Sequence, residues 1–191
     1  MKFTEGYWLQ SERAHSQYAA EAYYVDPIPG GMRVTAPLRL CEERGDTLNI
    51  GTITIDFVAR AADVISVHAW HYEGYDTGRP QFEKKESMLE DARLMISGEE
   101  AVLDAGEVQV RVHRKPFSYS FEAGGKVLTT CGFRNLGYIR WDLQPSTMFP
   151  EQNYLSSRCT PYMTNELSLG VGECVYGFGE RFTAFVKNGQ V

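Results

Sequence analysis

The sequence lacks any run of basic residues, and its formal net charge at pH 7 is −6. Nucleic acids and anionic membrane surfaces are bound by clustered lysine and arginine side chains. We therefore expect neither a nucleic acid nor a membrane as a partner. The opening residues, MKFTEGYW, hold no apolar run of signal-peptide length, and no apolar stretch elsewhere is long enough to span a bilayer.

Paired cysteine and histidine motifs are also missing. The four cysteines, Cys41, Cys131, Cys159 and Cys174, form no CxxC motif and lie at no zinc-ligand spacing. The glycine-rich C-terminal segment has neither a GxGxxG that opens a helix nor a GK[ST]. We expect buried free thiols, no metal, no bound cofactor, and a reducing, cytoplasmic location in which disulfides do not form.

No amphipathic helix of ten or more residues is evident, whereas short strand-like runs are frequent. Residues 52–58 (TITIDFV) alternate apolar and polar, and residues 64–72 (VISVHAWHY) mix β-branched and aromatic side chains, so we expect these two runs to pair. A second hairpin is expected between residues 18–25 and 31–35, around a stiff turn at 26–30 that contains two prolines.

Further strands are expected at short intervals, at residues 93–96, 101–103, 108–113, 118–122, 126–130 and 136–141. Residues 73–91 and 142–157 are predicted to be long surface loops, because they combine glycine or proline with charged and polar residues. Many short strands with regular turns are typical of a sandwich or a barrel. The sequence thus predicts an all-β fold in one domain, residues 1–191.

Candidate chemistry is sparse. His68 and His71 lie three residues apart in one expected strand, which places them on opposite faces and disfavours a shared metal site. Neighbouring carboxylates, as at residues 42–43, 90–91 and 99–100, do not face each other across a sugar pocket as glycoside hydrolysis requires.

Three aromatic residues, Trp70, Tyr72 and Tyr75, are candidates for a sugar-stacking platform. Trp70 and Tyr72 share a parity in the expected strand and so should lie on one face. Core packing is the competing interpretation, and it is favoured for at least one of the three.

The C-terminal residues 167–191 read LSLGVGECVYGFGERFTAFVKNGQV. Within them, GVGECVYGFGERFTAFVKNGQ resembles the motif that closes the first part of the N-terminal β-sandwich in family 31 glycoside hydrolases. Residues 177–190 are most similar to the bacterial α-xylosidase branch. Residues 4–9 and 64–74 also resemble that family.

The resemblance implies a galactose mutarotase-like β-sandwich (supersandwich) that is incomplete at its C-terminal end, where an open edge would favour homo-oligomers by strand contact. It implies a non-catalytic domain that supports a (β/α)8 barrel of the same polypeptide. The two catalytic aspartates of a retaining α-glycosidase would lie in that barrel, so no catalytic residue is expected here. The substrate of the parent enzyme would be an α-linked xyloside or glucoside.

A set of six consecutive residues is expected to form a structural hinge between sandwich and barrel: Gly177, Phe178, Gly179, Glu180, Arg181 and Phe182. The alternative interpretation is a free-standing carbohydrate-binding or mutarotase-like sandwich. In that case His68 or His71, with a nearby carboxylate, would act as acid and base on a sugar ring.

Overall fold

The computed structural model of the chain describes residues 3–5, 9–72, 87–142, 159–177, 179 and 182–189. Strands dominate these residues, and the helical segment among them is a single 3₁₀ turn, η1 (Arg44–Thr47). The short alternating runs of the sequence have too little apolar periodicity for longer helices. The prediction of an all-β fold is confirmed.

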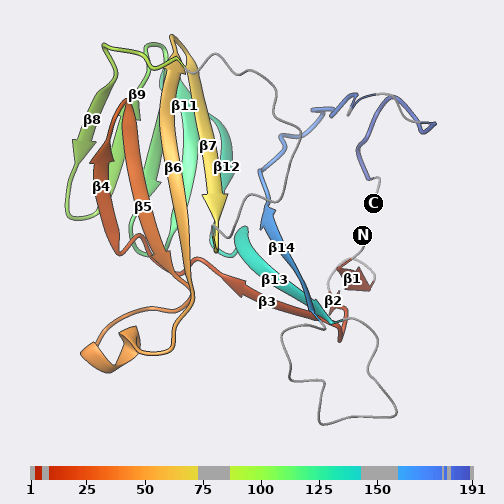
Figure 1. The fold of residues 1–191 in the computed structure, drawn as a ribbon. Helices are drawn as coiled ribbons and strands as arrows, with labels where there is room; N and C mark the ends of the chain where they lie inside the picture. The colour runs from red at the N-terminus through yellow and green to blue at the C-terminus, as the bar shows by residue number, and fades with distance from the viewer. Residues whose placement is uncertain are drawn as a thin grey trace, which may run out of the picture.

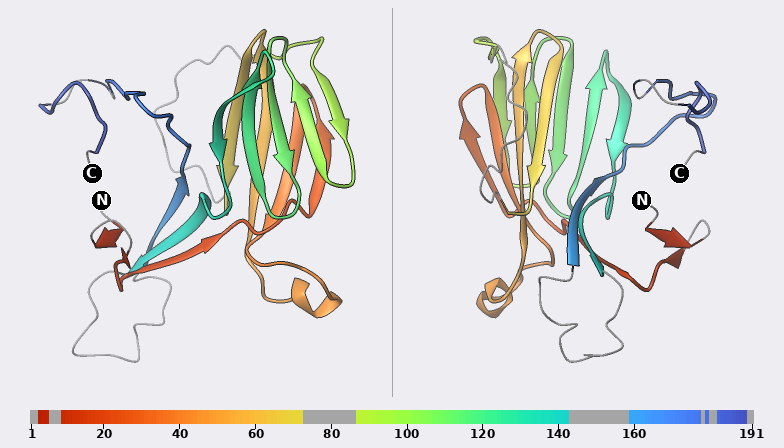
Figure 2. Two further views of the ribbon diagram at one scale, coloured as in Figure 1. Left: turned by 180° about the vertical axis from the view of Figure 1, so that it is seen from behind. Right: turned by 45° about the vertical axis from the view of Figure 1, so that its right-hand side comes forward.

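Two antiparallel sheets pack face to face as a sandwich (Figures 1 and 2). The four-stranded sheet has the order β4-β5-β6-β7, with bounds β4 (Tyr24–Ile28), β5 (Gly31–Pro37), β6 (Thr52–Ala61) and β7 (Val64–Trp70). The five-stranded sheet has the order β12-β11-β10-β9-β8, with bounds β8 (Arg93–Ile96), β9 (Glu100–Asp104), β10 (Val108–His113), β11 (Ser118–Ala123) and β12 (Lys126–Cys131).

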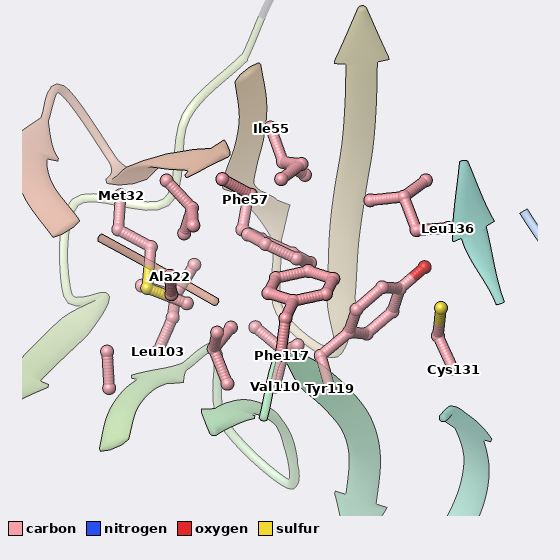
Figure 3. Packing of buried hydrophobic residues seen from close by; sticks show 14 of the residues in the cluster. Ala22, Met32, Ile55, Phe57, Leu103, Val110, Phe117, Tyr119, Cys131 and Leu136 are labelled. Atoms are coloured by element: carbon pink, nitrogen blue, oxygen red, sulfur yellow. The ribbon is translucent and has the colours of Figure 1, made fainter. Parts of the chain in front are cut away.

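The core fills the space between these two sheets (Figure 3). Alternate residues of each strand point inward, so the apolar positions of the sequence meet in one layer. Phe57 of β6 and Tyr119 of β11 meet edge to face, with ring centroids 5.1 Å apart. Phe117, just before β11, also contacts the Tyr119 ring. The large aromatic side chains therefore bridge the two sheets.

A third, three-stranded antiparallel sheet extends away from the sandwich (Figure 1). Its order is β14-β13-β3, with bounds β3 (Ala14–Tyr18), β13 (Leu136–Asp142) and β14 (Cys159–Asn165). Near the N-terminus, β1 (Thr4–Glu5) and β2 (Leu9–Gln10) form a small separate pair.

The predicted hairpin between residues 52–58 and 64–72 is confirmed, because β6 pairs with β7. The predicted single strand at residues 18–25 is wrong. Tyr18 ends β3 in the third sheet, and Tyr24 begins β4 in the sandwich. Ala19 and Ala22 between them are buried, because small side chains allow the chain to cross close to the core.

Two prolines lie inside strands, one of them in the predicted turn at 26–30 and the other where no strand was predicted. Pro27 belongs to β4, so the expected turn at 26–30 is shorter than predicted, and Pro161 belongs to β14. Both strands are outermost in their sheets. Proline is tolerated at an edge because it need not donate a ladder hydrogen bond.

Candidate functional site

The C-terminal segment closes into a small loop that contains the predicted hinge residues. Tyr176 forms an isolated antiparallel bridge with Val186, and the backbone N–H of Lys187 donates to the carbonyl of Val175 at 2.7 Å. Gly177 and Gly179 have φ values of 88° and 77°, a region that residues with a Cβ rarely adopt. These two glycines therefore permit the turn that reverses the chain.

This loop exposes large apolar side chains. Phe182 is fully exposed and Phe185 is 72% exposed. The Phe185 ring packs against Tyr176, with ring centroids 5.3 Å apart. Exposed aromatic groups gathered on one loop are typical of a surface that another structure covers.

Three of the six predicted hinge residues, Phe178, Glu180 and Arg181, lie outside the described residues. Gly177, Gly179 and Phe182 are described, and they place the motif on the exposed part of the loop. The hinge remains a prediction.

Trp70, a predicted sugar-stacking residue, lies at the end of β7 on the outward face of the four-stranded sheet. Its ring packs against His68 with centroids 4.7 Å apart and an interplanar angle of 30°. The guanidinium carbon of Arg33 lies 5.4 Å from the ring centroid. Arg33 in turn donates two hydrogen bonds to Asp56, at 2.7 and 2.8 Å.

The other two candidates do not join Trp70. β7 ends at Trp70, so the expectation that Tyr72 continues the strand on the same face is wrong. Tyr72 is 82% exposed, and no ring contacts it among the described residues. Tyr75 lies outside the described residues. The expected three-residue platform is therefore not assembled, and the Trp70 ring contacts His68 and Arg33 instead.

His68 and His71 occupy different surroundings, but the expectation that both lie in one strand on opposite faces is wrong, because β7 ends at Trp70. His68 is exposed on the outward face of β7. His71 follows the strand, where its Nδ1–H donates to the carbonyl of Thr52 at 2.9 Å and its ring stacks on Tyr138 at 4.1 Å. His71 therefore links the sandwich to the third sheet. This role disfavours His71 as an acid or base.

The second candidate acid–base pair is also disfavoured by its contacts. Asp56 is the cross-strand partner of His68, but both of its oxygens accept hydrogen bonds from Arg33. Among the described residues, neither oxygen of Asp56 is hydrogen-bonded to the His68 ring. The geometry thus argues against mutarotase-like proton transfer at His68.

The chain also contains a polar cluster that sequence reasoning did not find. His15 of β3 bonds to Asp142 of β13 at 2.7 Å, and the Cys159 thiol of β14 donates to the other oxygen at 3.1 Å. The thiol and the imidazole lower the pKa of Asp142, and the carboxylate raises the pKa of Cys159. A thiol held protonated is a poor nucleophile, so the cluster joins three strands rather than serving catalysis. No sequence motif links these three positions, which meet only through strand pairing.

The expectation of buried thiols holds for one cysteine. Cys131 is buried, and burial raises its pKa to about 11. Cys41 and Cys159 are half-buried, and Cys174 is exposed. Within the described ranges, no three His, Cys, Asp or Glu side chains converge closely enough to hold a metal ion.

Two of the cavities on the described surface lie beside the sandwich and beside the third sheet. One, of about 350 Å³, lies between the β4–β5 hairpin and β8, and Glu90 is its one acidic lining residue. The other, of about 430 Å³, lies beside β3, and Arg39 and Arg134 line it without an acidic partner. Neither cavity brings two carboxylates together. No helix among the described residues reaches the length and apolarity needed to cross a bilayer.

Residues 52–191 match the family model for the glycosyl hydrolase 31 N-terminal galactose mutarotase-like domain. The chain belongs to this family. Its mutarotase-like sandwich is the pair of sheets that enclose the core. The resemblance noted at the C-terminal residues is therefore confirmed.

Two curated relatives of this family 31 domain are α-xylosidases. The chain is 34% identical over 194 residues to alpha-xylosidase XylQ of Lactiplantibacillus pentosus and 30% identical over 200 residues to an alpha-xylosidase of Emericella nidulans. Each alignment covers 100% of this chain but only 23% and 25% of the respective relative. A solved cycloalternan-forming enzyme from Listeria monocytogenes aligns at 8% identity, with a TM-score of 0.48, over 70% of this chain and 12% of that one.

Proposed function

We propose that this chain is the non-catalytic N-terminal β-sandwich of an α-xylosidase-type family 31 hydrolase. The observation that carries this proposal is the coverage of the alignments: the chain spans about a quarter of each α-xylosidase that it matches along its whole length. The remaining three quarters of such an enzyme supply the catalytic (β/α)8 barrel. The domain supports that barrel and shapes the mouth of its active site, where an α-linked oligosaccharide binds.

The chemistry of the described residues supports a non-catalytic role. A retaining glycosidase needs two carboxyl groups about 5 Å apart on either side of the glycosidic bond. The two cavities hold one acidic residue and none, respectively. In this proposal, both catalytic carboxylates belong to the barrel.

The loop that contains Gly177 and Phe182 is the contact between sandwich and barrel. Burial of an exposed phenylalanine against a second domain is favourable, at about 25 cal/mol for each Å² of apolar surface removed from water. Phe182 and Phe185 supply such surface. Glu180 and Arg181 add charges of opposite sign that can pair across the contact.

We further propose a cytoplasmic location and a homo-oligomeric assembly for the parent enzyme. The four cysteines of this chain form no disulfide with one another, which suits a reducing, cytoplasmic compartment. The sandwich sheets end in β4, β7, β8 and β12. An exposed edge among these strands would allow pairing of two copies.

Two polypeptides assayed in parallel test this function. One is the 191-residue chain, and the other is the polypeptide from a reading frame that continues through a barrel-length segment. With a chromogenic α-xyloside, the long polypeptide should show turnover and the short chain none. Turnover by the repurified 191-residue chain would refute the proposal. So would accelerated interconversion of sugar anomers by the short chain, followed by polarimetry.

A further inference from the structure

The cavity of about 430 Å³ beside β3 lies where the sandwich meets the third sheet. Three segments line it: β3, the residues that follow β5, and the turn between β12 and β13. Two of these segments bring an arginine to it, Arg39 and Arg134, and none of its lining residues is acidic. The volume lies in the range of small-molecule pockets. The cavity is thus large enough for one small molecule, and the charge of its lining is positive.

The guanidinium of Arg39 is held by neutral acceptors. Nε and Nη2 donate to the carbonyl of Asp46 at 3.1 and 2.9 Å, and Nη2 also donates to the carbonyl of Leu48 at 3.1 Å. These bonds orient the guanidinium without cancelling its charge. The carboxylate of Asp46 is close enough to feel that charge, but it accepts from the backbone N–H groups of Glu42 and Glu43, at 3.0 and 2.9 Å. The Nη1 hydrogens of Arg39 therefore find no acceptor in the described part of the chain.

Arg134 lies in the turn between β12 and β13, and its guanidinium carbon is 5.4 Å from the centroid of the Phe133 ring. None of the ion pairs between described residues includes it. Its φ of 65° lies in the left-handed region, which glycine adopts far more readily than a residue with a Cβ. The arginine side chain is thus carried at a position whose backbone favours glycine, and strain of this kind is found at functional sites.

Two hydroxyl groups of β3 add hydrogen-bond donors to the same cavity. Ser16 and Tyr18 lie two residues apart in β3, and both line the cavity. The side-chain amide of Gln10 donates to both of their oxygens, at 2.8 and 2.7 Å. Each hydroxyl hydrogen is therefore left to donate to another group. The Tyr18 ring lies against Gly137 of β13, where an added Cβ would be 2.7 Å from it, so the glycine makes room for the ring.

We propose that this cavity binds a small organic anion through a carboxylate or phosphate group. Its two guanidinium groups match the planar geometry of such oxyanions, and its two hydroxyls can donate to further oxygens. The Phe133 ring, which is 52% exposed, offers an apolar wall for the body of the ligand. The net charge of the chain is −6, so affinity for an anion depends on these two arginines rather than on the overall charge.

Other charged positions in the chain lack this combination. Arg111 is paired with both Glu100 and Glu122, so its charge is compensated. The cavity of about 350 Å³ is lined by Glu90 and by no arginine. A single carboxylate side chain from elsewhere in the parent polypeptide would engage the arginines of the larger cavity but leave most of its volume empty. A free small molecule is therefore the better match. This role goes beyond the support of a barrel.

Isothermal titration calorimetry of the full-length polypeptide at low ionic strength, in a phosphate-free buffer, tests the proposal. Three ligands share one sugar ring: glucose is neutral, glucuronate carries a carboxylate, and glucose 6-phosphate carries a phosphate. At least one of the two anions should bind about tenfold or more tightly than glucose, and its affinity should fall as the salt concentration rises. The preferred anion distinguishes a carboxylate ligand from a phosphate ligand.

Arg134→Gly is the decisive variant, because it removes the guanidinium and places glycine at a left-handed position. It should weaken binding of the preferred anion about tenfold or more, and it should keep or raise the melting temperature. Arg93→Gln is the matched control: it removes an exposed positive charge from β8, at the opposite edge of the five-stranded sheet from β12, and should leave the affinity unchanged.

Two results would overturn the proposal. One is a wild type that binds neither anion more tightly than glucose, as expected if an acidic segment of the parent polypeptide fills the cavity. The other is equal affinity of the wild type and the Arg134→Gly variant, because the anion would then bind elsewhere, as in the barrel.

Discussion

The side-chain amide of Asn165 donates a hydrogen bond to the hydroxyl of Tyr119 at 2.7 Å. Asn165 ends β14 in the third sheet, whereas Tyr119 is buried between the sheets of the sandwich (Figure 3). Burial raises the pKa of the Tyr119 hydroxyl far above its usual value. The hydroxyl therefore remains protonated at ordinary pH, and the bond ties the third sheet to the core.

Tyr119→Phe should destabilise the protein by about 1 to 2 kcal/mol, because the Asn165 amide loses its buried acceptor. Urea denaturation followed by tryptophan fluorescence measures the free energy of unfolding. Tyr18→Phe is the control: it removes a hydroxyl that accepts a bond from Gln10 at an exposed position, and it should change stability by less than about 0.5 kcal/mol. Equal decreases in the free energy of unfolding for the two substitutions would show that the hydrogen bond from Asn165 contributes no more to stability than the exposed bond from Gln10.

Gly31→Ala should lower the free energy of unfolding by more than about 3 kcal/mol, and it should lower the yield of folded protein. A Cβ at Gly31 would lie 1.9 Å from the carbonyl oxygen of Phe57 in the adjacent strand, so β5 and β6 could not keep their spacing. Gly45→Ala is the matched control, because a Cβ at Gly45 meets nothing within 4 Å. Thermal unfolding compares the two, and similar melting temperatures would contradict this account.

Acidification should destabilise the protein partly through Glu122. Burial alone would raise the pKa of Glu122, but hydrogen bonds from Arg111, Gln109 and Ser120 outweigh it and lower the pKa. The carboxylate is thus favoured in the folded state, and its contribution is present above the unfolded-state pKa of about 4.3. That contribution is lost as the pH falls through the lower folded-state pKa.

Urea unfolding at several pH values between about 5 and 3 tests this dependence, with Glu122→Gln as the comparison. The variant should be less stable than the wild type at pH 7, and the difference should shrink on acidification. A difference that stays constant over this range would show that Glu122 does not contribute to the pH dependence.

Glu180→Ala in the full-length enzyme tests the proposed contact between sandwich and barrel. If the Glu180 carboxylate is buried against a partner, its removal should lower the free energy of unfolding by about 3 to 5 kcal/mol. If the carboxylate is exposed, the decrease should be below about 1 kcal/mol. We expect a clearly lower melting temperature and a nearly unchanged KM for a small α-xyloside. Glu107→Ala, at an exposed position in the β9–β10 turn, should change neither. A large rise in KM at constant melting temperature would instead assign Glu180 to substrate binding.

The local pattern of apolar, glycine and proline residues was sufficient to predict most strands of the sandwich. The alternation in residues 52–58 predicted β6 and its pairing with β7, because a strand with one buried face must repeat every second residue. The glycines and prolines that punctuate the chain predicted the short strands from β8 to β12. The strand β14 was not predicted, and it contains Pro161, which is tolerated there because β14 is at the edge of its sheet, a position that the sequence does not reveal.

Among the candidate residues, too, local properties could be predicted from the sequence, whereas contacts between strands could not. Gly177 and Gly179 could be read as turn residues in advance, since their need for positive φ is a local property. Trp70 could be singled out, but not its neighbours Arg33 and Asp56, which come from two other strands. Their meeting depends on the register of β5 and β6.

By itself, the amino-acid sequence determined an all-β chain of short strands, and its C-terminal glycine and aromatic motif indicated the family. Both are local properties, because strand formation and turn formation depend on residues only a few positions apart. Only the tertiary structure decided that His71 packs on Tyr138, that Asn165 reaches Tyr119, and that Arg33 lies between Asp56 and Trp70. These relationships join residues distant in sequence, so they exist only once strand register and sheet packing bring the side chains together.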